Sequence, residues 1–233
     1  MAITKISSAL IGANTIATSN IADNAVDGTK IAQNSILTRH IDDGQVTTAQ
    51  IGADAITGAK IADDAIDFID DSKKFDNPYF MYLAFNAPHD PRQAPKRFLD
   101  MYPMDKINVP VNYSSIHPYW KDIGNGPGLR DEALAPYPRS KYAVKKHIQE
   151  YFAVITHLDE QVGKIISHLE DQNMLDNTYI IFTSDHGLAV GQHGLIGKQS
   201  LYDHSIRVPY VVVGPEVEAG KRVSAPIYIQ DSV

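Results

Sequence analysis

Two short polar motifs and a lysine stand where the sequence could support chemistry on an anion. His89 and Asp90 follow one apolar run, Asp185 and His186 follow another, and Lys198 lies a short way further on. A carboxylate and an imidazole can ligate a divalent cation, while an ammonium group and a second imidazole can hold a tetrahedral oxyanion beside it. A metal next to an anion polarises its oxygens and stabilises charge in the transition state. The pattern therefore indicates metal-assisted hydrolysis of a sulfate or phosphate ester.

Each of these residues also has a purely structural interpretation. A histidine beside a proline in a loop is usually a hydrogen-bonding surface residue, and an Asp-His-Gly sequence after a strand is often a capped turn. We interpret the nearby His193 and His204 in this way, as residues that make structural hydrogen bonds. It is the combination of motifs, and no single residue, that points to chemistry.

Apolar patterns predict the elements that would position these residues. Apolar runs over 79–85, 178–184 and 207–213 end at polar or Gly-Pro positions and predict buried strands. Apolar residues at spacings of three and four predict a long amphipathic helix over about 141–171, with Ser140 at its start. This order predicts an α/β fold with a parallel sheet, in which strand 178–184 lies beside 79–85. Parallel strands would bring both polar motifs to one sheet edge, where ligands bind in such folds.

Three stretches of the chain resemble successive motifs of the sulfatase family, which belongs to the alkaline-phosphatase superfamily. They are PYFMYLAFNAPHDP, YFAVITHLDEQVGKIISHLEDQNMLDNT and TSDHGLAVGQHGLIGKQSLYDHSIRVPYVVVGP, in an order and spacing that match the family over nearly all of residues 72–233. The resemblance implies a partial alkaline-phosphatase-like parallel sheet with flanking helices. It also implies that sulfated sugars or aryl sulfates are the substrates.

Carried over residue by residue, the resemblance implies roles for four side chains. Asp185 and His186 would be ligands of a divalent metal, usually calcium. Lys198 would contact the sulfate, and His89 would contact it as well or protonate the leaving oxygen. His186 is an unusual ligand for calcium, which prefers oxygen, although family members carry either Asn or His at this point.

The sequence lacks the residues that supply the nucleophile in this family. Sulfatases use a formylglycine made from Cys or Ser in a C/S-x-P-x-R motif, and this chain has neither that motif nor any cysteine. The family's earlier pair of acidic metal ligands is absent as well. We therefore expect no activity from this chain alone, and interpret it as a sulfatase fragment fused to a stalk, a module that needs a partner chain, or a non-catalytic fibre or adhesion protein that binds sulfated glycans. A phosphodiesterase or phosphatase of the same superfamily is a further alternative, although the GxHGxxGK and RVP spacing favours sulfatases.

Residues 1–67 differ from the rest of the chain in composition and pattern. They contain no proline or aromatic residue, whereas all 13 Pro, 7 Phe, 12 Tyr and 1 Trp lie beyond them. A β-branched aliphatic residue recurs at every fifth position: Ile6, Ile11, Ile16, Ile21, Val26, Ile31, Ile36, Ile41, Val46, Ile51, Ile56, Ile61 and Ile66. Period five fits neither a helix nor a strand, and it favours an elongated β-solenoid or a stalk of three intertwined chains. It resembles the pentapeptide-type repeats of phage tail fibres and bacterial surface proteins, so we predict a stalk that presents a sulfatase-like α/β domain at 68–233.

The composition excludes some partners and leaves others open. A formal net charge of −7 argues against nucleic acid as a partner. Short apolar runs predict neither a signal peptide nor a transmembrane segment, so the compartment stays unknown, with virion or surface association suggested by the stalk. The expected partners are a sulfated carbohydrate or an aryl sulfate, together with further copies of the chain in a trimer held by the repeats. The long loop over 108–138, with Trp120 and RDEALAPYPR, could line a substrate pocket, but packing is the favoured role.

Overall fold

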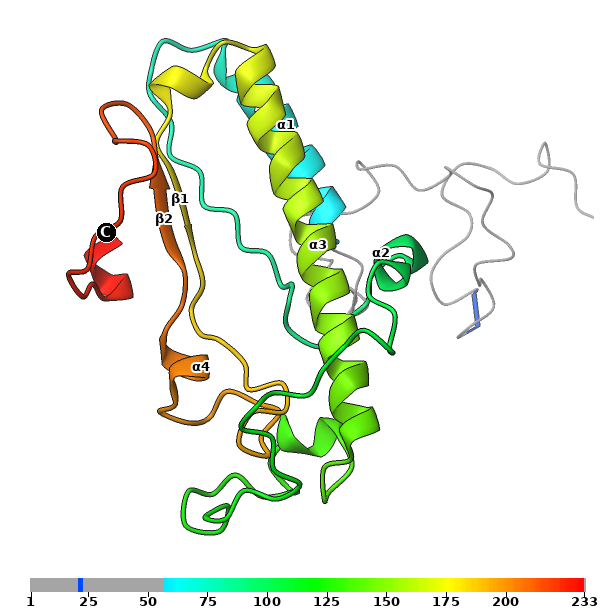
Figure 1. Ribbon diagram of the computed structural model, residues 1–233. Helices are drawn as coiled ribbons and strands as arrows, with labels where there is room; N and C mark the ends of the chain where they lie inside the picture. Colours follow the sequence, from blue (N-terminus) through cyan, green and yellow to red (C-terminus); the bar gives the residue numbers. More distant parts are fainter. Residues whose placement is uncertain (1–20, 23–56, 233) are drawn as a thin grey trace, which may run out of the picture. The chain divides into compact units, whose positions relative to one another are not determined.

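The computed structural model describes residues 21–22 and 57–232 (Figure 1). Most of the five-residue repeat therefore lies outside the described residues, and a solenoid or trimeric stalk there stays a prediction. The described part beyond residue 56 is built on one long helix, with a shorter helix packed along it and a small sheet. Among the described residues, no helix has the length and apolar character needed to cross a bilayer.

Helix α3, Lys141–Asp171, confirms the predicted amphipathic helix. It begins where Ser140 caps it, because the Ser140 side chain accepts a hydrogen bond from the Ala143 amide at 3.1 Å. Its apolar stripe is buried at both ends, through Val144 and Ile148 near the start and Ile165 and Leu169 near the end. One helix thus connects two hydrophobic clusters.

Helix α1, Gly58–Ser72, occupies the last residues of the five-residue repeat. Its buried residues, Ala62, Ala65 and Ile69, follow helical spacing and pack against Ile165 and Leu169 of α3. The predicted coil is therefore wrong for residues 58–67, because here a helical apolar stripe finds a partner helix. Helix α1 also crosses residue 67, and the division of the chain into 1–67 and 68–233 stays a prediction.

The sheet differs from the predicted one. Strands β1, Ile180–Thr183, and β2, Tyr210–Val213, form where the apolar runs predicted strands, but they pair antiparallel, with Ile180 opposite Val213. The predicted parallel pairing of 178–184 with 79–85 is therefore wrong. An apolar run indicates that a strand forms, but not which segment it pairs with.

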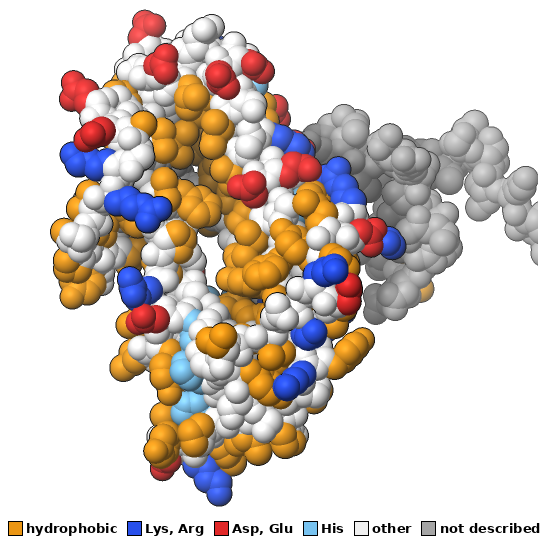
Figure 2. Space-filling view, in the orientation of Figure 1, with side chains coloured by type: hydrophobic (Ala, Val, Ile, Leu, Met, Phe, Trp, Pro, Cys, Tyr) orange, Lys and Arg blue, Asp and Glu red, His pale blue; other side chains and the backbone are white. Residues whose placement is uncertain are grey.

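Residues 79–85 are extended but form no strand, although their apolar pattern predicts one. Tyr79, Met81, Leu83 and Phe85 pack against the α1–α3 cluster, whereas the alternating Phe80 and Tyr82 are 88% and 81% exposed. Figure 2 shows hydrophobic side chains at the surface on both sides of the hollow between the helices and the sheet. One face of this segment is thus buried against the helices, and its opposite face is exposed.

In the described part of the chain, five short elements lie in the connections between the longer ones and at the end of the chain. They are α2, Lys96–Asp100; η4, Glu132–Leu134; η5, Leu175–Asn177; α4, Asp203–Ile206; and η6, Ile229–Ser232. Near the start of α3, a second cluster joins Ile107, Val144, Ile148 and Val190. This cluster fixes the loop after β1 against the helix.

The packing of α1 on α3 is open to a direct test. Replacing Ile69, which is 1% exposed, with Ala should lower the free energy of unfolding by about 2–4 kcal/mol, because it leaves a cavity between the helices. The matched control is Phe75→Ala, at a position 68% exposed, which should change it by less than about 1 kcal/mol. Urea unfolding followed by circular dichroism measures both, and equal losses would contradict the packing.

Candidate anion site

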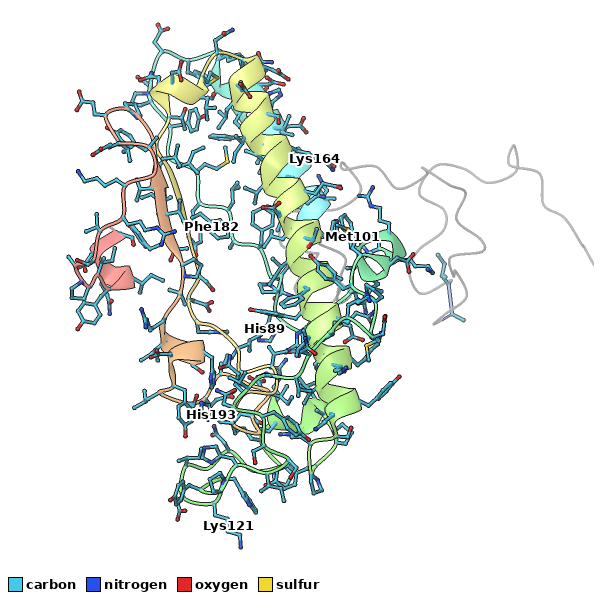
Figure 3. All side chains as sticks on the ribbon, viewed as in Figure 1. His89, Met101, Lys121, Lys164, Phe182 and His193 are labelled. Atoms are coloured by element: carbon cyan, nitrogen blue, oxygen red, sulfur yellow. The ribbon has the colours of Figure 1, made fainter. Side chains whose placement is uncertain are left out.

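His89 and Lys198 meet across two loops that are far apart in the sequence. The Lys198 ammonium donates to His89 Nε2 at 2.8 Å, and Figure 3 shows His89 between α3 and the loops that follow β1. Because an ammonium group can only donate, Nε2 accepts, and the imidazole proton lies on Nδ1. Nδ1 lies 2.9 Å from the Asp90 carbonyl oxygen and 3.2 Å from its carboxylate, so Asp90 orients the ring.

The second polar motif lies beside this pair. The rings of His89 and His186 are 6.4 Å apart between centroids, in an edge-to-face arrangement. Asp185 lies next to His186, with its Oδ2 3.4 Å from His186 Nε2, and its side chain is 80% exposed. The structure thus brings together the four residues that the sequence singled out, at one end of β1.

The described residues do not by themselves fit a calcium site. Calcium takes six to eight oxygen ligands, whereas this corner offers the Asp185 carboxylate and the His186 imidazole. No group of three or more potential ligand side chains occurs among residues 21–22 and 57–232. The two side chains can serve at most as part of a metal site.

The glycine after the Asp-His pair, Gly187, is required by a close backbone contact. A Cβ at this position would collide with the carbonyl oxygen of His204, so only glycine permits the close approach. The Gly187 amide also donates to the Ser205 carbonyl at 2.9 Å. The motif therefore has a structural role in addition to presenting Asp185 and His186.

The loop over 108–138, for which packing was the favoured role, contacts the candidate site. Arg130 reaches Asp90 with one nitrogen, at 2.9 Å, and Asp131 with the other, at 2.7 Å. It thereby joins the motif after residues 79–85 to the 108–138 loop, whose Asp131 in turn accepts a hydrogen bond from the Gln199 side chain at 2.7 Å, next to Lys198. No periodic pattern marks this link, but the charged run Arg130-Asp131-Glu132 inside a Pro-rich loop is an indication of it.

Comparison with known proteins identifies the family of this chain. The Sulfatase family model matches residues 17–232, which is nearly the whole chain and begins well before the motifs do. The chain belongs to the sulfatase family. It is 30% identical to a sulfatase of Formosa agariphila over 163 residues, covering 67% of this chain and 31% of that protein. It is 32% identical to human iduronate 2-sulfatase over 174 residues, covering 69% of this chain and 30% of that enzyme.

Solved structures agree with the family assignment. Ps i-CgsB, crystallised with k-i-k-neocarrahexaose, matches with a TM-score of 0.51 and 28% identity, over 73% of this chain and 31% of that one. A phosphonate monoester hydrolase of Silicibacter pomeroyi shares the fold, with a TM-score of 0.60 and 24% identity, over 74% of this chain and 36% of that one. This sulfatase-family chain thus spans about a third of the length of the relatives that it matches.

A stack of aromatic rings lies next to the site in this sulfatase-family chain. His193 and Tyr202 stack at 4.3 Å between centroids, and His204 lies 5.5 Å from Tyr202 on the same stack. His193 Nε2 bonds the Asn112 side chain at 3.0 Å, and His204 Nε2 bonds Ser200 at 3.2 Å. These contacts agree with the structural roles expected for both histidines.

The stack predicts how stability depends on pH. Burial, reinforced by the neighbouring His193, lowers the pKa of His204 to about 4, whereas an unfolded histidine titrates near 6.5. Between these values the unfolded chain binds more protons, so stability should fall as pH drops from about 6.5 to 4. His204→Asn should reduce that loss by about 1–2 kcal/mol, less than the full shift implies because the ring is only partly buried. Urea titrations at several pH values measure the slope, and an unchanged slope in this variant would count against the assignment.

Proposed function

We propose that this chain is the sulfate-contacting part of a sulfatase-family domain that acts on sulfated carbohydrates or aryl sulfates. The contact between Lys198 Nζ and His89 Nε2, at 2.8 Å, is the observation that carries the proposal. A cation and an imidazole side by side can together hold a tetrahedral oxyanion. Both residues also stand in the stretches that resemble the family's motifs.

The two side chains would have different roles toward a bound sulfate ester. Lys198 would donate to a sulfate oxygen in place of His89, which frees Nε2 of the imidazole. Once protonated there, His89 could donate to the oxygen of the leaving group as a general acid. Asp90, which accepts from Nδ1, would stabilise the resulting imidazolium.

Asp185 and His186 would contribute to the divalent metal that the family resemblance implies, usually calcium. A bound metal would polarise the sulfate oxygens. Because the described residues offer a carboxylate and an imidazole, we expect weak metal binding by this chain alone. The nucleophile, a formylglycine in the family, has no counterpart in the sequence, so binding without turnover is the expected behaviour of the chain.

A fibre or adhesion protein that binds sulfated glycans without cleaving them is the second candidate. The same contact between Lys198 and His89 supports it, since binding requires the anion site but no nucleophile. The part of the five-residue repeat that precedes α1 would present such a domain as a stalk. A phosphoesterase of the same superfamily is a third candidate, which rests on likeness of fold.

The anion site predicts a selective loss of binding. Lys198→Ala and His89→Ala should each weaken binding of k-i-k-neocarrahexaose roughly 10- to 100-fold, because each removes a charged or charge-assisted hydrogen bond. The control is Lys96→Ala, whose ammonium contacts only Asp100 and is 84% exposed. Isothermal titration calorimetry measures the affinities, with the chemically desulfated hexasaccharide as the second control. Equal binding of both sugars would refute recognition of the sulfate.

The missing nucleophile predicts that the chain turns over neither class of ester. We expect no hydrolysis of 4-nitrophenyl sulfate or 4-nitrophenyl phosphate above background, with or without millimolar calcium. Release of nitrophenol that depends on Lys198 would overturn this expectation, and the faster of the two esters would then identify the activity. The readout is absorbance over several hours at high protein concentration.

A further inference from the structure

We propose that Glu132 is a positioning residue of the anion site, which holds the backbone directly before Lys198 and so fixes where the ammonium group lies. This inference rests on the proposed role of Lys198 and goes beyond it, because Glu132 lies outside the motifs that resemble the family. The observations that support the inference are buried contacts between η4 and the loop that carries Lys198.

The Glu132 carboxylate binds two consecutive amides of that loop. Its Oε2 accepts from the Ile196 amide at 3.0 Å, and its Oε1 accepts from the Gly197 amide at 2.9 Å. The side chain is fully buried, with 0% exposure. Hydrogen bonds from backbone amides to a buried carboxylate are short and strong, and here they join residues 64 and 65 positions apart.

Arg139 compensates the buried charge and secures the carboxylate itself. Its guanidinium, which is also 0% exposed, donates to Glu132 Oε2 and to the carbonyl oxygens of Glu132 and Ala135, both at 2.7 Å. Its Nε donates to the Gly194 carbonyl at 3.2 Å, within the loop that carries Lys198. Arg139 thus holds both partners of the contact, the turn that presents Glu132 and the loop that Glu132 binds.

Asp131 holds the other side of Lys198. Its Oδ2 accepts from the Gln199 side-chain amide at 2.7 Å, and only 3% of its side chain is exposed. Burial alone would raise the pKa of Asp131, but the hydrogen bond from Gln199 and the charges of Lys198 and Arg130 outweigh it and lower the pKa. Adjacent carboxylates therefore bind the residues on both sides of Lys198.

Gly197 gives independent support for this close approach. A Cβ at residue 197 would lie 2.7 Å from Asp131 Cβ and 2.6 Å from Gln199 Oε1, closer than atoms can pack. The glycine before Lys198 therefore lets the loop backbone lie directly against the Asp131-Glu132 pair. The carboxylates and the glycine together leave the loop little freedom to move Lys198.

Stability alone does not explain a buried ion pair in this position. An apolar pair of similar volume is often as stable, because removing two charges from water costs several kcal/mol. What an apolar pair could not do is accept hydrogen bonds from the Ile196 and Gly197 amides. The ionic pair therefore contributes a fixed backbone next to Lys198.

The test measures two properties of a Glu132 variant, the hydrogen exchange of the loop before Lys198 and the affinity for sulfate. Glu132→Gln keeps the size of the side chain but turns one acceptor into a donor that opposes the loop amides. We expect the amides of Ile196 and Gly197 to exchange hydrogen at least about 10-fold faster, while the amide of Val154 in the middle of α3 keeps its rate. Affinity for inorganic sulfate, followed through the NMR signals of the His89 ring against a chloride control of equal ionic strength, should fall about 10-fold.

A double-mutant cycle separates positioning from general stability. If Glu132 acts through Lys198, adding Glu132→Gln to Lys198→Ala should cause almost no further loss of sulfate affinity. Full additivity of the two losses would overturn the proposal.

Two further variants cover the case in which Glu132→Gln leaves Arg139 unpaired and fails to fold. Glu132→Leu combined with Arg139→Met replaces the ion pair with apolar side chains, and Gln199→Ala leaves the buried pair intact. Both should fold and bind sulfate more weakly, with faster exchange at Ile196 and Gly197 in the double variant. Wild-type affinity in both variants, or wild-type exchange at Ile196 and Gly197 in the double variant, would refute the positioning role. A wild-type chain that binds no sulfate would refute the proposed function instead, while the exchange rates would still decide the role of Glu132.

Discussion

The buried ion pair of Arg139 and Glu132 is the constraint on which the site depends. Two charges without solvent access are tolerated only when each is paired and its remaining hydrogen-bonding atoms are satisfied. Here those atoms are satisfied by the Ile196 and Gly197 amides and by the carbonyl oxygens of Ala135 and Gly194. Meeting this requirement forces the turn at η4, the start of α3 and the Lys198 loop into one arrangement.

Local signals in the sequence predicted the parts of the fold that local contacts determine. Helix α3 follows from its apolar spacing and from Ser140 at its start, and β1 and β2 follow from their apolar runs. Strand pairing depends on contacts between distant segments, so the sequence pointed to a parallel neighbour for β1 where the structure has antiparallel β2. The helix at Gly58–Ser72 was missed because a period of five hides a stripe of Ala62, Ala65 and Ile69 that becomes clear only against α3.

The sequence likewise predicted some residues of the candidate site and missed others. His89, Asp185 and His186 could be predicted because they follow apolar runs, and Lys198 because it stands in a stretch that resembles a family motif; the structure brings the four together. Asp131 and Glu132 could not, because a Pro-rich loop has no periodicity that would show which side is buried. Their partners lie more than 60 positions further along the chain, and a contact at that separation leaves no local pattern.

The sheet is only partly covered by the described residues, whereas the loop that carries Lys198 is held by buried contacts. Apolar runs as continuous as those of β1 and β2 are typical of strands covered on both faces, yet Ile181, Phe182 and Val211 are 49%, 43% and 48% exposed. The Lys198 loop, by contrast, is held by buried groups from residues 131–139 and by packing on the start of α3, all within the described part of the chain. Lys198 is therefore positioned by contacts that do not involve the sheet. The loop that carries Lys198 can thus keep its geometry while the sheet stays uncovered, as the proposed binding without turnover would require.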